Sequence, residues 1–323
     1  MRYVCAMAVE HEDSVEKVLH SSSSAAQSFV AASWCRSGLK YGLDAGADQG
    51  RELVSGSELT QRRERHGLML EVARPLLDQL FQTVAATGCA VMLSDKDGVI
   101  LESRSQTGDR AMFDQVGLTP GGVWSESREG TNGIGTCLVE GRPVTIHRDE
   151  HFASRNIGIS CMDAPVRDAA GRLVGALDIS NCRDDHSAAM GALVQKIVQD
   201  AARRIESGVF RKFFEGHRII DANLPGGDAA LLAVYRDDLV IGAAGAPFMV
   251  LLLVFVLNKM MAVFSMLFGA GVLLVTERIE ARGGSALGVH YVRNVLLGLI
   301  GLAHGALWFG DILLVYGVCA MLL

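Results

Sequence analysis

Apolar residues recur at helical spacing in two long stretches of the chain, Glu58 to Thr87 and His186 to Phe214. In the first stretch they stand four positions apart, at Leu68, Val72, Leu76, Leu80 and Val84. Residues at this spacing share one helix face, so both stretches predict long amphipathic helices. Pro75 predicts a kink or a new helix start, because proline has no backbone N–H to donate. A further helix is expected over Ser14 to Arg36.

Shorter apolar runs between the two long helices predict β-strands. We expect strands at Cys89 to Leu93, at Val99 to Glu102, around Val144 and Ile146, around Ala164 and Val166, and from Leu173 to Ile179. Asp95 to Gly98 predicts a hairpin turn, since aspartate and glycine tolerate the backbone angles of a tight turn. The last run is almost continuously apolar, which is typical of a strand buried on both faces. These elements predict an α+β fold, an antiparallel sheet flanked by helices.

A glycine-rich motif, GTNGIGT at residues 130–136, follows the predicted hairpin. It predicts a polar turn and a short helix that Thr131 or Asn132 caps, because a side-chain oxygen there can accept from the free amides of the helix. The glycine and proline that follow at 141 and 143 end this helix. The loop from Phe152 to Gly158 could cover a cavity.

Three motifs together give the chain a family resemblance. GTNGIGT, RPVTIHRDEHF at residues 142–152 and ARRIE at residues 202–206 resemble the GAF sensor domain of acetoin-type (AcoR-like) activators of sigma-54 promoters. The likeness extends from about residue 30 to about residue 242. It implies a domain that binds a small effector and rearranges its terminal helices, without chemistry on the effector. The helix from His186 to Phe214 could pack on the sheet, pair with a second copy in a homodimer, or do both.

The charge pattern divides the chain. Only seven of its 66 charged residues lie in the 85 residues from Leu239 onward. Four apolar runs there predict membrane spans, at residues 239–257, 260–275, 292–309 and, incompletely, 312–323. Arg278, Arg282 and Arg293 favour a cytoplasmic loop between the second and third spans, and two spans earlier the GAF domain lies on the same side. We therefore expect a multi-pass protein of the inner (cytoplasmic) membrane with a cytoplasmic GAF domain.

The predicted membrane region has its own resemblance. Residues of about 247–323 are similar to part of the YeiB-type bacterial membrane family (domain of unknown function 418), and His304 and Asp311 match positions of its motif. Ionisable side chains are costly within a membrane, so this pair is a candidate for function, with structural hydrogen bonding and interface placement as the alternative. The expected domains are an N-terminal helical segment with linker (1–58), the GAF domain (59–215), a partial PAS-like hairpin with linker (216–245) and the transmembrane helices (246–323).

Several functions are not expected. The sequence contains no GxxxxGK[ST] phosphate loop and no C-terminal helix-turn-helix, so neither ATP hydrolysis nor direct DNA binding is predicted. The net charge of −6 implies no general affinity for nucleic acid. The seven cysteines lack CxxC or metal-finger spacing, which favours free thiols in a reducing cytosol. The N-terminus does not resemble a signal peptide. No Ser/His/Asp or paired-carboxylate spacing predicts catalysis, and no cofactor is expected.

The candidate ligand-binding residues lie near the presumed GAF pocket. They are Trp124, Asn132, Cys137, His147, Phe152 and Cys161. Trp124 could stack on a ligand or cap the core. His147 and His151 would suit a metal ion only on a helix, and His147 ends a predicted strand, so no metal site is expected. Cys137 and Cys161 are expected to be buried thiols rather than a redox or metal site.

The sequence thus predicts a non-enzymatic, membrane-tethered sensor with an unidentified small effector. It derives from a transcriptional regulator but lacks that regulator's ATPase and DNA-binding domains. One alternative is a membrane-integral, transport-related protein with a regulatory soluble domain. The other is an accidental gene fusion, because both family resemblances are incomplete where they meet.

Overall fold

The computed structural model describes residues 2–20, 28–47, 50–182, 188–223, 229–236 and 240–244, with a few separate positions between 277 and 299. The chain divides into two compact units, Met1–Ala246 and Pro247–Leu323. Nearly all of the described residues belong to the first unit.

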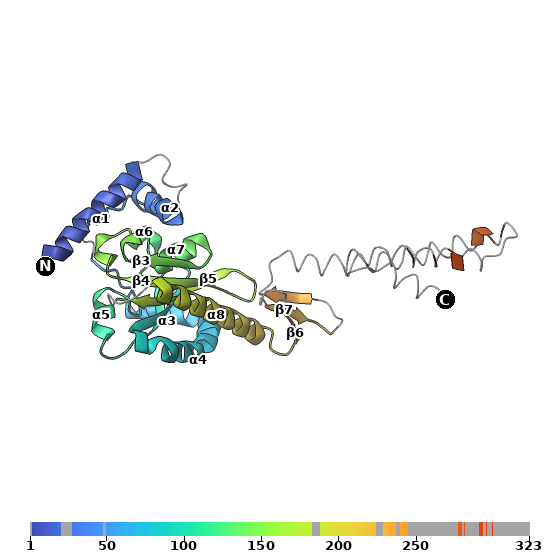
Figure 1. The fold of residues 1–323 in the computed structure, drawn as a ribbon. Coiled ribbons are helices and arrows are strands. Elements are labelled where there is room, and N and C mark those ends of the chain that lie inside the picture. The colour runs from blue at the N-terminus through green and yellow to red at the C-terminus, as the bar shows by residue number, and fades with distance from the viewer. Residues whose placement is uncertain are drawn as a thin grey trace. The chain divides into compact units, whose positions relative to one another are not determined.

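A five-stranded sheet forms the centre of the first unit (Figure 1). Its strands are β1 (Cys89–Asp95), β2 (Ile100–Arg104), β3 (Val144–His147), β4 (Ser160–Arg167) and β5 (Leu173–Asn181), in the order β2-β1-β5-β4-β3. Every neighbouring pair is antiparallel. The α+β fold with an antiparallel sheet is therefore confirmed.

Two long helices, α4 (Gly67–Val84) and α8 (Ala188–Phe213), cover one face of the sheet. Their apolar faces bury Leu77, Val198 and Ile205 against Met162 and Ile179 of the strands. The predicted new start at Pro75 is wrong, because Pro75 lies inside α4. The break falls at residue 66, which separates α4 from α3 (Gly56–Arg65) and leaves the helical backbone region.

Shorter helices cover the opposite face. They are α5 (Arg110–Gln115), α6 (Glu126–Glu129) and α7 (Gly133–Glu140). Asn132 caps α7, since its side-chain oxygen accepts from the Gly135 N–H at 2.8 Å. Gly141 ends α7 with φ +63°, a left-handed conformation that glycine adopts without strain. The predicted cap and helix end are thus confirmed.

The remaining helical segments are short or lie before the sheet. The N-terminal part contains α1 (Arg2–His20), α2 (Phe29–Cys35) and the π-helical turn η2 (Arg36–Lys40). Three 3₁₀ turns are η3 (Ala85–Thr87), η4 (Arg148–Glu150) and η5 (Ser154–Asn156). Figure 1 shows α1 and α2 on the side of the sheet that carries α6 and α7.

A second, three-stranded antiparallel sheet follows α8. It comprises β6 (Arg218–Asn223), β7 (Ala229–Val234) and β8 (Val240–Ala244), in that order. Phe210 and Phe214 pack against Leu231 and Ala233 of β7. The hairpin predicted within residues 216–245 is confirmed as β7 and β8, and β6 is a strand that the sequence did not predict.

The predicted C-terminal α-helical transmembrane region requires correction. Its first span was to begin at Leu239, but Val240–Ala244 forms β8, whose backbone pairs with β7. Within the part of the chain that the structure describes, no helix is long and apolar enough to cross a membrane. The predicted first span is therefore wrong over Val240–Ala244, and the described residues give no support to a C-terminal transmembrane region. The other predicted spans lie almost wholly outside the described residues, and His304 and Asp311 lie outside them.

Candidate functional site

Two aspartates lie directly opposite each other in the central sheet. Asp163 of β4 and Asp178 of β5 are register partners, and both side chains are fully buried. Because strand side chains alternate between faces, both point toward the face covered by α7, away from α8. The neighbouring pair on the same face is Cys161 with Ser180. We call Asp163 and Asp178 the acid pair.

Burial keeps the acid pair protonated. Burial and the neighbouring carboxyl raise the pKa of Asp163 well above its usual range. Burial also raises the pKa of Asp178, although the Ser180 hydroxyl, which donates to its Oδ2 at 2.8 Å, opposes the shift. Two carboxylates this close cannot both ionise cheaply, so the pair retains a proton near neutral pH. Apart from a proton shared with Asp178, no donor among the described residues reaches either oxygen of Asp163.

A thiol and an imidazole extend the cluster from the acid pair. Cys161 Sγ lies 3.2 Å from the Ser180 hydroxyl and 3.5 Å from His151 Nε2. His151 Nδ1 lies 2.9 Å from the Arg148 carbonyl oxygen, which can only accept, so Nδ1 carries the proton and Nε2 accepts from the thiol. Burial lowers the pKa of His151 to about 4 and raises the pKa of Cys161. Both groups are therefore neutral near pH 7.

The first turn of α7 packs directly against the acid pair and Cys161. A Cβ on Gly133 would lie 2.1 Å from Asp163 Oδ2 and 2.4 Å from the Cys161 Cβ, so only glycine fits there. The apolar side chains that surround the cluster include Ile134, Cys137, Ile146 and Ile159. A few polar groups within an apolar wall are typical of small-molecule sites.

The structure places two of the six predicted site residues in this cluster. Cys161 contacts Ser180 and His151, and Cys137 is buried on α7, where Asp163 and Asp178 raise its pKa after the larger effect of burial. Phe152 is buried beside His151, with its ring against Gly130.

The other three predicted residues make hydrogen bonds within the domain. Trp124 is buried, and its indole N–H donates to the Gly117 carbonyl at 2.8 Å. Asn132 is fully buried as the α7 cap, and its amide donates to the Gly130 carbonyl. His147 Nδ1 lies 2.9 Å from the Ser160 hydroxyl at the end of β3. These side chains already have partners within the protein.

The sequence patterns did not predict the acid pair, and His151 was considered only as a metal ligand. A signal existed, because Asp178 interrupts a run that was correctly predicted as a buried strand, and Asp163 stands between Met162 and Ala164. A carboxyl group in a buried strand is rare without a function. Among the described residues, no group of three or more His, Cys, Asp or Glu side chains could hold a metal ion.

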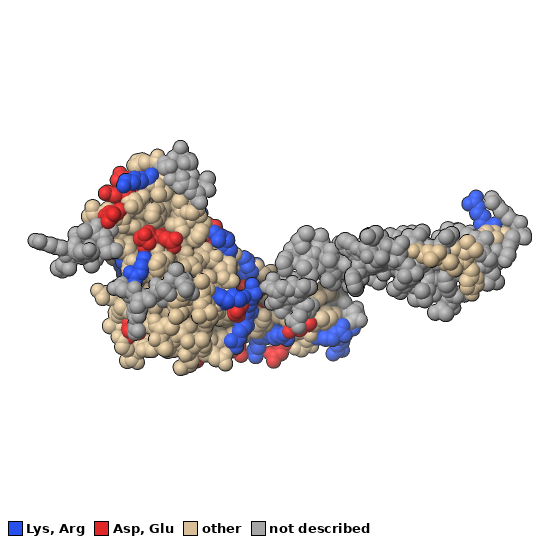
Figure 2. Space-filling view, viewed as in Figure 1, with Lys and Arg blue, Asp and Glu red and all other residues tan. Residues whose placement is uncertain are grey.

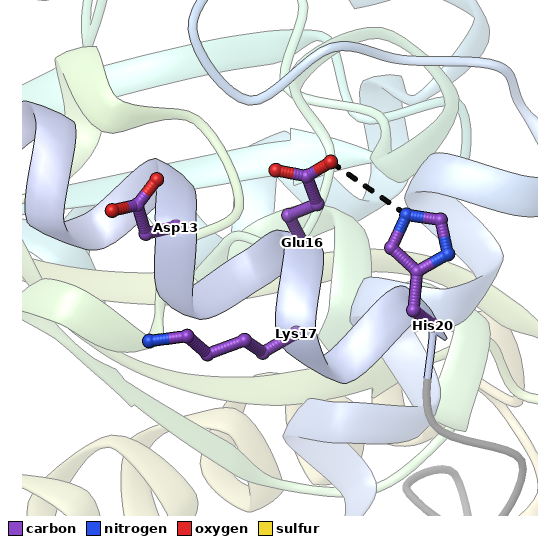
Figure 3. Close-up of a pocket in the computed structure, with 4 residues that line it drawn as sticks. All are labelled: Asp13, Glu16, Lys17 and His20. Atoms are coloured by element: carbon purple, nitrogen blue, oxygen red, sulfur yellow. Dashed lines mark ion pairs between the residues drawn. The ribbon is translucent and has the colours of Figure 1, made fainter.

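A separate hollow lies on the surface of α1. Asp13, Glu16, Lys17 and His20 line its volume of about 390 Å³, and His20 Nε2 lies 3.6 Å from Glu16 Oε1 (Figure 3). All four side chains come from one helix, and the His20 and Glu16 side chains are well exposed. Figure 2 shows acidic side chains on the surface in the region of α1 and α2. Without buried polar groups, this hollow is a weaker ligand site than the acid pair.

Comparisons with known proteins match the central sheet and its helices. Residues 69–205 match the GAF domain family. The chain is 32% identical over 186 residues to the acetoin catabolism regulatory protein of Cupriavidus necator. This alignment covers 58% of this chain and 27% of that protein. It is 31% identical over 153 residues to the acetoin dehydrogenase operon transcriptional activator AcoR of Bacillus subtilis. This second alignment covers 47% of this chain and 25% of that protein. The matched region thus spans about a quarter of each relative, 27% and 25% of their lengths.

A solved structure supports the fold. The crystal structure of the E. coli DhaR(N)-DhaL complex is similar with a TM-score of 0.50 and 20% identity, over 55% of this chain and 60% of that chain. At this identity the likeness shows the fold alone. None of these comparisons supports the predicted YeiB-type membrane domain. Because the relatives are regulators by name, they give no support to a location in the inner membrane either.

Proposed function

We propose that this chain, which carries a GAF domain related to AcoR-type transcriptional activators, is a sensor that binds a small effector at the acid pair. The observation that carries the proposal is Asp163, whose buried oxygens lack a donor among the described residues other than the shared proton. A buried polar group without a partner costs about 1–3 kcal/mol. A ligand that donates a hydrogen bond to Asp163 would recover part of this cost.

The cluster favours an effector that donates hydrogen bonds. The Ser180 hydroxyl already donates to Asp178, and the His151 Nδ1–H already donates to the Arg148 carbonyl. Beyond the proton shared with Asp178, the acceptor capacity that remains on the Asp163 carboxyl has no donor among the described residues. The names of two relatives refer to acetoin, so acetoin, whose hydroxyl can donate to a carboxyl oxygen, is the first compound to test.

Two side chains of α8 connect the acid pair to the end of the domain. Gln195 Nε2 donates to the main-chain carbonyl of Asp163 at 3.0 Å, while Gln195 Oε1 accepts from the Thr145 hydroxyl at 2.7 Å. Further along α8, Glu206 Oε1 accepts from the Arg167 N–H at 2.8 Å. An effector that shifts β4 would therefore shift α8, which leads into the second sheet. We propose α8 as the output element of the sensor.

The output of the sensor is proposed to be regulatory. Leu193 and Phe213 of α8 are exposed, which suits pairing with a second copy of the chain. By analogy with its relatives, the sensor would contribute to control of transcription, and no turnover of the effector is expected. The proposed ligand set is Cys137, Cys161 and Phe152 from the sequence, together with Asp163, Asp178 and His151 from the structure.

A thermal-shift screen of the full-length protein tests the proposal. Small hydroxylated metabolites, beginning with acetoin, are added at increasing concentration. A ligand that binds only the folded state raises the melting temperature in a concentration-dependent way. We expect at least one such compound. A panel in which no compound raises the melting temperature would contradict the sensor function.

A further inference from the structure

The N-terminal part of the chain lies over the loop beside the acid pair. Its described residues, 2–20 and 28–47, are here called the cap. Three hydrogen bonds join the cap to the loop that contains η4 and η5: His11 Nε2 to the Phe152 carbonyl (3.2 Å), Trp34 Nε1 to the Glu150 carbonyl (2.8 Å) and the Ser154 N–H to the Ala45 carbonyl (2.9 Å). These bonds hold a loop whose own side chains close the site.

A second anchor joins the cap to α6 and α7. Arg36 Nε donates to Glu126 Oε1 at 2.7 Å, and Arg36 Nη2 donates to Glu140 Oε1 at 2.8 Å. The Ser33 hydroxyl donates to Glu126 Oε2 at 2.9 Å. Because the Glu126 side chain is buried, loss of these partners would leave it unpaired in the interior, which is costly. The cap is therefore held by specific polar contacts as well as by packing.

A continuous chain of contacts leads from the cap to the acid pair. Phe152 packs with Val15 and Ala45 of the cap, and its other side lies against Gly130. His151, the preceding residue, is wholly buried and contacts Cys161. Cys161 in turn contacts Ser180, the residue that donates to Asp178. Loss of the cap contacts would leave this loop with fewer attachments, such as the bond from the Phe152 N–H to the Thr131 carbonyl, and its opening would then uncover Cys161.

The base of the loop has separate attachments. Arg155 Nη2 and Asn156 Nδ2 both donate to Glu129, at 2.9 and 3.2 Å. Movement that begins at the cap would therefore stop near residue 155, which confines it to the segment around His151 and Phe152.

We propose that the cap is a lid on the acid pair, and that local release of the cap and of residues 148–154 gives a ligand its route to Asp163. The acid pair is fully buried, so a ligand can reach it only through an opening movement. Local openings of this kind occur in the native state when few contacts hold a segment. The identity of the ligand as an effector rests on the proposed function, but the test of the lid requires no effector.

The cysteines of the chain report the opening. Cys161 lies beneath the loop, whereas Cys89 is buried in the other core, between the sheet and the helices α4 and α8. The full-length protein is treated with N-ethylmaleimide under native conditions, and mass spectrometry of peptides follows each cysteine. Two variants loosen the lid: Arg36→Ala removes the Glu126 and Glu140 contacts, and Trp34→Phe removes only the indole N–H.

A matched control removes an equivalent ion pair elsewhere. Arg104 has the same side-chain exposure as Arg36, 24%, and likewise bridges two carboxylates, those of Asp78 and Glu102. We expect Arg36→Ala to accelerate labelling of Cys161 by about tenfold, because the substitution removes charge-assisted hydrogen bonds to two carboxylates. Trp34→Phe should give a smaller acceleration. The rate at Cys89 should stay unchanged, and Arg104→Ala should not change the rate at Cys161.

Two results would overturn the lid. In the first, Cys161 reacts at the wild-type rate in both cap variants, so the cap does not control access. In the second, Cys161 and Cys89 accelerate together, so the substitutions unfold the whole domain. Either result would leave the thermal-shift test of effector binding unaffected.

Discussion

Asp163 and Asp178 are register partners on neighbouring antiparallel strands, and burial raises the pKa of both carboxyl groups. The folded protein therefore holds protons that the unfolded chain, with ordinary aspartate pKa values near 4, releases. Stability must depend on pH where the two states bind different numbers of protons. This consequence can be measured without knowledge of the effector.

Stability should fall as the pH rises from 6.5 to 8. In this range the unfolded carboxyls are already deprotonated, while the folded acid pair and Glu206, whose pKa burial raises to about 7, still lose protons. The folded state therefore binds more protons, and the free energy of unfolding decreases with pH. His66 and His151, whose pKa values burial lowers, act in the opposite direction up to about one unit above the ordinary histidine pKa of about 6.5, so they offset part of the decrease at the lower end of this range. Urea unfolding at several pH values measures the slope.

The variant Asp163→Asn isolates the contribution of the acid pair to this slope. It removes one of the two coupled carboxyls but leaves Glu206, His66 and His151 in place. The decrease in stability between pH 6.5 and 8 should become shallower than in the wild type. Parallel curves for the two proteins would show that the acid pair does not hold a proton in this range.

Gly133→Ala should destabilise the domain by about 1–3 kcal/mol, the usual cost of overpacking. The added Cβ would meet Asp163 Oδ2 at 2.1 Å and the Cys161 Cβ at 2.4 Å, so α7 or β4 must move. Gly158→Ala is the control, because a Cβ there has no neighbour within 4 Å. Chemical denaturation compares the two variants. Equal stability would show that α7 does not press against the acid pair.

Asn132→Ala should cost about 1–2 kcal/mol, because α7 loses its N-cap. The side-chain oxygen of Asn132 accepts from the Gly135 N–H, and its amide donates to the Gly130 carbonyl. Asn132→Ser keeps a capping oxygen and should lose less. Urea unfolding midpoints compare the stability of the two variants. If Asn132→Ser is as unstable as Asn132→Ala, the result would argue against the capping role.

Trp124→Phe should reduce stability by about 1 kcal/mol, the typical contribution of one hydrogen bond. The substitution removes the indole N–H that donates to the Gly117 carbonyl but keeps an aromatic ring in the core. We expect the affinity for the effector to stay within about twofold of the wild type, less than the tenfold of a 1.4 kcal/mol contact. A large loss of affinity in calorimetric titration would restore Trp124 as a ligand contact.

Local sequence patterns were sufficient to predict most of the central domain. The alternation around Val144 and the apolar run before Ile179 marked strands, and the pair Thr131 and Asn132 marked the start of α7, because these signals depend on neighbours in the chain. The apolar residues from Leu239 were misinterpreted as a membrane span. The same residues also fitted the second strand of the predicted hairpin, because a short apolar run suits a strand as well as a helix, and pairing with β7 shows that Val240–Ala244 is the strand.

The candidate site could be predicted only in part. Cys161 was found because it lies near the presumed GAF pocket. Asp163 and Asp178 were missed as a pair, because the register between β4 and β5 brings them together and sequence spacing does not fix register. The bond between His11 and Phe152 joins residues 141 positions apart, which no local pattern can predict.

Effector affinity of the acid-pair variant tests the central claim most directly. The compound identified in the thermal-shift screen is titrated calorimetrically into the full-length wild type, into Asp163→Asn and into Glu206→Gln. Glu206 is the matched control, since it too is a largely buried carboxyl with a raised pKa, but it lies on α8 across the sheet. We predict that Asp163→Asn weakens binding by at least about tenfold, or 1.4 kcal/mol, while Glu206→Gln binds as the wild type does. Equal affinity in wild type and Asp163→Asn would contradict the account.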